Sequence, residues 1–270
     1  MQPHKPGKRL IVVGDIHGQL EPFVKILQHA RLINQHWDWC GGESRLVQMG
    51  DVYDRGPKSI EADLLLDKLQ RQAANSTGEV VRLVGNHELE IMLGNFVISG
   101  MEGLEAKTIR AKLNRQVLEG ELRGAYAYKG FLFTHAGVTQ KLLRIFKQQL
   151  EDASAHNLAV LINLIFKESI RHQFFKHPIF NISIHRNGTD RFGGIFWEDI
   201  TDLIKSFPTT PPLWQVIGHT QVQQIVIDKQ SQVIPVDVGM HRLLQYLVIE
   251  SGETAPKICT VTDSASPGMD

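Results

Sequence analysis

Five apolar runs in this sequence each end in side chains that can bind a metal ion or carry a proton. The run ends read Gly14-Asp15-Ile16-His17, Gly50-Asp51, Gly85-Asn86-His87, Thr134-His135 and Gly218-His219. Carboxylate, imidazole and amide ligands without a thiolate suit manganese, iron or zinc, whereas calcium would not require the histidines. Two such ions about 3.5–4 Å apart, sharing one carboxylate, are the usual arrangement for hydrolysing phosphate esters. Asp51, a lone carboxylate at the second run end, is the natural bridge.

The elements that must position these residues follow a strand–loop–helix order in the first half of the chain. Residues 9–13, 45–49 and 79–84 are mostly apolar, as internal strands are. Helical spacing follows at 20–30 and at 59–69. In the second of these helices we expect four residues to form the buried face: Ile60, Leu64, Leu65 and Leu69. This order predicts an α/β layer architecture, in which ligands gather outside the carboxyl ends of the strands.

The second half of the chain departs from the strand–loop–helix order of the first half. Residues 139–177 carry helical periodicity twice and predict a helical cap or insert beside the sheets. Short apolar runs then favour a second, largely antiparallel sheet packed on the first: 213–217, 225–228, 233–238 and 243–250. Ser, Thr, Pro and Gly are frequent over residues 251–270, which we expect to be a disordered tail. We find no repeat or linker, so we expect a single domain over residues 1–250.

Composition narrows the class of protein. The chain is 42% hydrophobic and 21% charged, which is ordinary globular material. Lys plus Arg equals Asp plus Glu at 29 each, so no net charge attracts nucleic acid or an anionic membrane. The first residues run into a strand without an apolar signal core, and two cysteines are too few for a disulfide framework. These features predict a cytoplasmic enzyme-like domain with no nucleic-acid or membrane partner.

Together, the run ends resemble a known family. Gly14-Asp-Ile-His-Gly, Gly50-Asp-Val-Tyr-Asp-Arg-Gly and Gly85-Asn-His-Glu are similar to the signature blocks of the phosphoprotein phosphatases, within the calcineurin-like metallophosphoesterases. The resemblance spans residues 10–240 and looks most like the Shewanella-like, bacterial-type branch. It implies an α/β (α+β) fold of two packed mixed β-sheets flanked by helices, with a helical insert.

The resemblance also implies roles for individual residues. One metal ion would be held by Asp15, His17 and Asp51. The other would be held by Asp51, Asn86, His135 and His219. His87 would be the general acid, oriented by Asp54, and Arg55 would grip the phosphate. The implied reaction is in-line attack on a phosphate ester by a water or hydroxide that bridges two divalent ions, manganese first, with iron or zinc as alternatives.

One position departs from the family pattern. Many members carry a second phosphate-binding arginine just after a tryptophan block, but here that block reads Trp197-Glu198-Asp199. Three other arginines could substitute: Arg191, Arg186 and Arg242. The sequence does not choose among them.

The expected substrate is a phosphorylated protein or peptide, or a small phosphoester, with phosphotyrosine and phosphoserine/threonine both open. One alternative is symmetrical hydrolysis of dinucleoside polyphosphates, by a related branch that usually lacks an aspartate at the position of Asp54. Another is a catalytically weak phosphoprotein-binding module, which only the absent second arginine favours. Tyr53, inside the second block, is expected either to line the site or to pack in the core.

Overall fold

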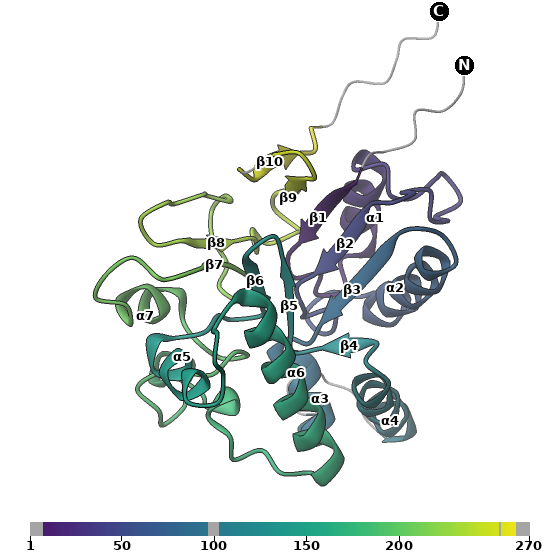
Figure 1. Ribbon diagram of the computed structural model, residues 1–270. Coiled ribbons are helices and arrows are strands. Elements are labelled where there is room, and N and C mark those ends of the chain that lie inside the picture. Colours follow the sequence, from purple (N-terminus) through teal and green to yellow (C-terminus); the bar gives the residue numbers. More distant parts are fainter. Residues whose placement is uncertain (1–7, 97–102, 254, 263–270) are drawn as a thin grey trace, which may run out of the picture.

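Two mixed β-sheets, flanked by helices, form the protein (Figure 1). The computed structural model describes residues 8–96, 103–253 and 255–262. The first sheet has the strand order β10-β9-β1-β2-β3-β4, and the second has the order β5-β6-β7-β8. This architecture confirms the predicted fold class.

The first sheet is parallel in its centre. Its strands are β1 (Arg9–Val13), β2 (Arg45–Gln48), β3 (Glu79–Leu83), β4 (Leu122–Arg123), β9 (Gln245–Glu250) and β10 (Lys257–Thr260). β1, β2, β3 and β4 pair in parallel, whereas β9 and β10 add antiparallel strands beside β1. The carboxyl ends of β1, β2 and β3 therefore meet at one edge.

Alternate side chains of β1 enter two different cores. Leu10 and Val12 pack with residues of the second sheet, such as Phe133, whereas Ile11 and Val13 pack with the helices. The two helices that follow β1 and β2 are α1 (Leu20–His29) and α2 (Ser59–Ala74). Burial on both faces explains why the first strands read as continuous apolar runs.

The buried face of α2 differs from the one that apolar spacing predicts. Leu65 and Leu69 are buried, but Ile60 and Leu64 are 37% and 56% exposed. The helix also buries acidic residues, of which Asp63 is 2% exposed. The reason is a partner on β3, because the buried guanidinium of Arg82 pairs with Asp63.

The predicted antiparallel character of the second sheet is wrong. Its strands are β5 (Ala125–Tyr128), β6 (Phe131–Thr134), β7 (Trp214–Ile217) and β8 (Val233–Pro235). Only β5 and β6 pair antiparallel, while β6–β7 and β7–β8 are parallel. The long helical crossover between β6 and β7 permits parallel pairing, which a short hairpin cannot.

Two further expectations about the C-terminal part need correction. Residues 225–228 form no strand, and residues 245–250 join the first sheet as β9 rather than the second. Residues 257–260 form β10 against β9, so the expected disorder from 251 onward is wrong for this stretch. Residues 263–270 of the expected tail lie outside the described residues.

The remaining helices flank the second sheet and the lower edge of the first (Figure 1). They are α3 (Asn86–Leu93), α4 (Gly103–Glu119), α5 (Gln140–Lys147), α6 (Ala155–His172) and α7 (Ile200–Lys205). The two helices expected within 139–177 are present, and α6 packs on β5, β6 and α4. A capping role for them, and a single domain over 1–250, stay predictions. None of the described helices combines the length and apolar character needed to span a membrane.

Candidate functional site

Strand ends from both sheets converge on one cluster of side chains. The cluster contains two groups of side chains that could hold a metal ion. Within each group, the potential ligand atoms all lie within 4.8 Å of one another. The first group is His17, Asp51 and His87. The second is Asp51, His135 and His219. Asp51 belongs to both groups, as a bridging carboxylate would.

Asp51 lies between two imidazoles. Its Oδ2 is 3.6 Å from Nε2 of His17 and 3.5 Å from Nε2 of His135. The Oδ2 atom of Asp15 is 3.9 Å from the same nitrogen of His17. Both carboxylates are at most 3% exposed. These atoms could therefore surround a cation on the His17 side of Asp51.

On the other side of Asp51, Asn86 meets two histidines. Its Oδ1 is 3.0 Å from Nε2 of His135 and 2.8 Å from Nδ1 of His219. Nδ1 of His135 lies 2.8 Å from the carbonyl oxygen of Met49, which can only accept, so that nitrogen carries a proton. In the neutral ring, the lone pair on Nε2 then faces the oxygens of Asn86 and Asp51. Such a set of electron-rich atoms is stabilised by a cation, so the donors fit a metal ion.

His17 also presents an unprotonated ring nitrogen that could bind a metal ion. Its Nδ1 donates to the carbonyl oxygen of Tyr53 at 2.9 Å, which leaves Nε2 without a proton. That Nε2 is buried and has no hydrogen-bond partner within the described part of the chain, although it faces Asp15 and Asp51. Burial lowers the pKa of His17 to about 4, so the ring is neutral and able to bind a metal near pH 7.

The electrostatics of the cluster also favour cations. Burial, together with the neighbouring carboxylates of Asp237 and Asp51, raises the pKa of Asp15 well above its usual range. Burial alone would raise the pKa of Asp51 too, but the imidazoles of His135, His87 and His17 outweigh it and hold that pKa well below the usual range. Several buried carboxylates that repel one another form a suitable site for divalent ions.

Glu88 supports the loop that carries Asp51. Its buried carboxylate accepts main-chain N–H groups of Asp51 (2.8 Å), Val52 (2.8 Å), Tyr53 (3.2 Å) and Gly85 (2.8 Å). Asp51 needs this support because its φ of 54° is in the left-handed region. Sequence reasoning assigned no role to Glu88, although it is the last residue of the Gly-Asn-His-Glu block.

Asp237 is a second residue that sequence reasoning left without a role. It is 4% exposed and acts on the carboxylate of Asp15. Its Oδ1 accepts the main-chain N–H of Gly239 at 2.9 Å. The available signal was local, because Asp237 directly follows the apolar run 233–236 and precedes Gly239 by two residues.

His87 lies beside the cluster and has a different partner. Its Nδ1 lies 2.5 Å from Oδ2 of Asp54, and its Nε2 lies 3.4 Å from the guanidinium of Arg55 and 3.9 Å from Asp51. Burial lowers the pKa of His87, but the bond to Asp54 and the charge of Asp51 raise it overall. A ring held protonated by an aspartate can donate a proton, so the geometry suits an acid rather than a metal ligand.

The three arginines proposed as second phosphate ligands lie in different surroundings. The guanidinium of Arg242 donates to the main-chain carbonyls of Val222 and Val238. Arg191 stacks on the ring of Phe192, 5.2 Å from its centroid. Arg186 binds Thr220, next to His219, at 2.7 Å. Its charge also contributes to lowering the pKa of His219, after burial and His135, so the field of Arg186 reaches the cluster.

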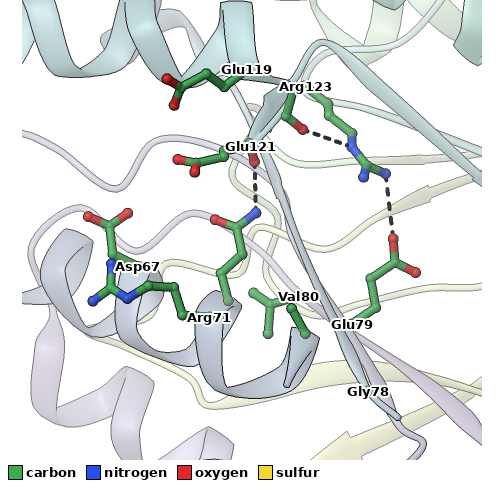
Figure 2. A pocket seen from close by; sticks show the side chains of 11 residues that line it. Asp67, Arg71, Gly78, Glu79, Val80, Glu119, Glu121 and Arg123 are labelled. Atoms are coloured by element: carbon green, nitrogen blue, oxygen red, sulfur yellow. Dashed lines mark hydrogen bonds and ion pairs between the residues drawn. The ribbon is translucent and has the colours of Figure 1, made fainter. Parts of the chain in front are cut away.

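A separate polar hollow of about 330 Å³ lies at the amino end of β3 (Figure 2). Glu79 faces Arg123 across it at 3.6 Å, and Gln70 donates to the carbonyl oxygen of Glu121. Among the described residues, none of the expected site residues lines this hollow. The chemistry therefore lies at the opposite, carboxyl end of the sheet.

The fold and the ligand cluster define a class of protein. This chain belongs to the calcineurin-like phosphoesterase family, whose sequence profile matches residues 8–223.

Within that family, the resemblance to the Shewanella-like branch is confirmed. The chain is 38% identical over 98 residues to Shewanella-like protein phosphatase 2 of Arabidopsis thaliana, and 40% identical over 88 residues to Shewanella-like protein phosphatase 1 of Plasmodium berghei. The matched stretches cover 36% and 33% of this chain, but only 25% and 24% of those relatives.

A solved structure shares the whole fold. The cold-active protein-tyrosine phosphatase of a psychrophilic Shewanella species superposes with a TM-score of 0.65. The superposition covers 96% of this chain and 82% of that one, at 16% sequence identity. At this level of identity the similarity concerns the fold.

Proposed function

We propose that this chain is a metal-dependent phosphomonoesterase with two metal ions, acting on phosphorylated proteins or peptides. The observation that carries the proposal is the position of Asp51, whose Oδ2 faces Nε2 of His17 at 3.6 Å and Nε2 of His135 at 3.5 Å. Family membership and the relatives named as protein phosphatases support the same activity.

Six side chains would hold the ions: Asp15, His17, Asp51, Asn86, His135 and His219. Two divalent ions, manganese first and iron or zinc as alternatives, would supply an activated water and neutralise phosphoryl charge. Around them, the main-chain contacts of His17 and His135 present Nε2 of each ring toward Asp51.

Three further residues would handle the substrate. His87 would donate the proton on Nε2 to the leaving oxygen while Asp54 holds the opposite nitrogen. Arg55 is exposed beside His87 and would grip the phosphate oxygens. Arg186, rather than Arg191 or Arg242, is the best placed second cation, since its charge reaches His219.

The same reasoning favours a phosphopeptide over a dinucleoside polyphosphate. The related polyphosphate branch usually lacks the aspartate at position 54, and here Asp54 holds His87. A weak phosphoprotein-binding module is not favoured either, because every expected ligand and His87 come together. The cytoplasm remains our proposed location.

The decisive experiment concerns Asp51. Protein stripped with chelator and resupplied with manganese is expected to hydrolyse an aryl phosphate, and Asp51→Asn is expected to abolish turnover. Asp38→Asn is the matched control, because Asp38 pairs with Lys68 on the surface, 2.7 Å away. Full activity in Asp51→Asn would refute the two-metal proposal.

Substrate class is tested on the same preparation. Phosphotyrosine and phosphoserine peptides are compared with a dinucleoside tetraphosphate at equal concentration. We expect faster release of phosphate from at least one peptide; preferential cleavage of the dinucleotide would reassign the chain to the polyphosphate branch.

A further inference from the structure

A glutamine is buried at the end of β2, just before the residues that form the candidate site. Gln48 is 0% exposed, and its chain neighbours Val47 and Met49 are buried apolar residues. Its Nε2 donates to the carbonyl oxygen of Gly50 at 2.6 Å, while its Oε1 has no hydrogen-bond partner among the described residues. A buried amide whose oxygen is unpaired is costly, so stability alone does not account for a glutamine at this position.

The bond from Gln48 reaches the peptide group that joins Gly50 to Asp51. The carbonyl oxygen of this group accepts from Gln48, and its N–H, which belongs to Asp51, donates to Oε2 of Glu88 at 2.8 Å. Buried side chains thus hold one planar peptide group at both ends. Because a rotation of this group would break both bonds, the two side chains fix the direction in which the chain enters Asp51.

The backbone on both sides of this peptide group is in the left-handed region. Gly50 has a φ of 99°, and Asp51 has a φ of 54°, which residues other than glycine rarely adopt. Gly50 is also closely surrounded, since a Cβ there would lie 2.5 Å from the main-chain nitrogen of Gly85 and 2.9 Å from Nδ1 of His135. A backbone of this kind persists only where its surroundings hold it. Gln48 supplies one of the bonds that do so.

The turn at Gly50 positions several of the proposed metal ligands. The carbonyl oxygen of Met49 accepts from Nδ1 of His135 at 2.8 Å. Oδ2 of Asp51 faces the Nε2 atoms of His17 and His135, at 3.6 and 3.5 Å. A shift of this turn would therefore move the carboxylate of Asp51 relative to both imidazoles. Tyr53, two residues further on, is 1% exposed and packs in the core rather than lining the site.

We propose that Gln48 is a positioning residue, whose hydrogen bond to Gly50 holds Asp51 where a bridging metal ligand must lie. The proposal rests on the proposed function for its consequence for metal binding. Gln48 itself is buried and its amide nitrogen is bonded to the main chain, so it acts through the peptide group between Gly50 and Asp51.

Gln48→Met tests the proposal by removing the amide while keeping the length of the side chain. Loss of a group that orients a metal ligand usually costs about 10–100-fold in affinity, so we expect the Kd for manganese, measured by calorimetry, to rise about ten-fold. In metal-free protein, we expect amide hydrogen exchange over residues 50–53 to become about ten-fold faster, because the peptide group is released at one end.

Gln116→Met is the matched control. Gln116 of α4 is 2% exposed, its Nε2 donates to Asp67 of α2 at 2.8 Å, and its Oε1 likewise has no partner among the described residues. This bond joins two helices and involves no residue of the turn at Gly50. We expect Gln116→Met to leave manganese affinity and hydrogen exchange over residues 50–53 within about two-fold. Equal changes in both variants, or no change in Gln48→Met, would overturn the proposal.

The two measurements also separate this proposal from the proposed function. Wild-type protein that binds manganese but hydrolyses no phosphate ester would refute the proposed function, while the titrations would still decide on Gln48. Faster exchange in Gln48→Met with unchanged affinity for manganese would show that the bond stabilises the turn alone, and would overturn the positioning role.

Discussion

Asn86 and His87 are adjacent in the chain, yet the fold gives their side chains different partners. They begin α3, where successive side chains point in different directions. Asn86 thus meets His135 and His219, whereas His87 turns to Asp54. This separation allows one dipeptide to supply both a metal ligand and an acid.

His87→Asn should separate these two tasks. We expect kcat for phenyl phosphate to fall by roughly 10²–10⁴, the usual effect of losing a general acid, while bound metal is unchanged. Nitrophenyl phosphate should show a smaller loss because its leaving group needs little protonation. Steady-state kinetics and elemental analysis provide the measurements; an equal loss for both esters would remove His87 from the acid role.

Glu198 is a buried carboxyl that the proposed reaction does not use. It is 0% exposed, Oε1 accepts the N–H of Asp199 at 2.9 Å, and Oε2 has no hydrogen-bond partner among the described residues. Burial raises its pKa from 4.5 to about 8. Its protonated form is therefore the one that the folded protein favours near neutral pH.

This pKa predicts a pH-dependent stability. The unfolded chain loses the Glu198 proton near pH 4.5 and the folded chain near pH 8. Stability from this group is thus fully present below that window and is lost as pH rises through it. In Glu198→Gln this contribution to the pH dependence should vanish. Urea unfolding at about pH 5, 6.5 and 8 checks it; parallel wild-type and variant curves would contradict it.

At the scale of elements, the junction between β3 and α3 brings two strand ends close together. A Cβ atom on Gly85 would lie 2.1 Å from Oδ1 of Asp51 and 2.5 Å from its main-chain nitrogen. Glycine is therefore required here by close approach, since its φ of −94° is open to any residue.

Gly85→Ala should disturb the metal cluster as well as the fold. We expect the free energy of unfolding to fall by about 1–3 kcal/mol, as overpacking of a tight contact does, with loss of bound manganese. Gly252→Ala is the control, because a Cβ there meets no atom of the described residues within 4 Å. Thermal unfolding measures the loss of stability, and metal analysis measures the loss of bound manganese. Normal metal content in Gly85→Ala would contradict the prediction, because it would show that the Asp51 loop can shift and still bind metal.

At the scale of the whole molecule, the site lies where the two sheets meet. Asp15 and Asp51 follow β1 and β2 of the first sheet, while His135 and His219 follow β6 and β7 of the second. Bound ions would therefore link the sheets and offset repulsion among the buried carboxylates.

Metal removal should accordingly lower the stability of the whole protein. Ligand that binds only the folded state at a hundred times its Kd adds about 2.7 kcal/mol, so chelator-treated protein should gain stability of that order when manganese is restored. Denaturant unfolding with and without the ion measures the gain. Asp51→Asn should gain much less, and identical curves for wild-type protein would exclude linkage between metal and fold.

The chemistry of the site and the class of fold follow from local features of the chain. Asp15, Asp51 and Asn86 each follow an apolar strand run and a glycine, and both signals are local in the chain. Parallel strands then bring their carboxyl ends to one edge, whatever the details of packing. Parallel pairing thus accounts for the meeting of these three residues, whereas the full ligand set is implied by the resemblance to the phosphoprotein phosphatases.

Which polar residues are buried and which strands pair depends on contacts between distant parts of the chain. Asp63 is buried because Arg82 and Lys112, which are distant in the chain, neutralise it. The spacing of apolar residues along a helix contains no information about such partners. β7 pairs parallel with β6 because a long helical crossover separates them. The position of Arg186 beside His219 likewise depends on Thr220 and Asp199. In each case, the energy comes from residues that meet only after folding.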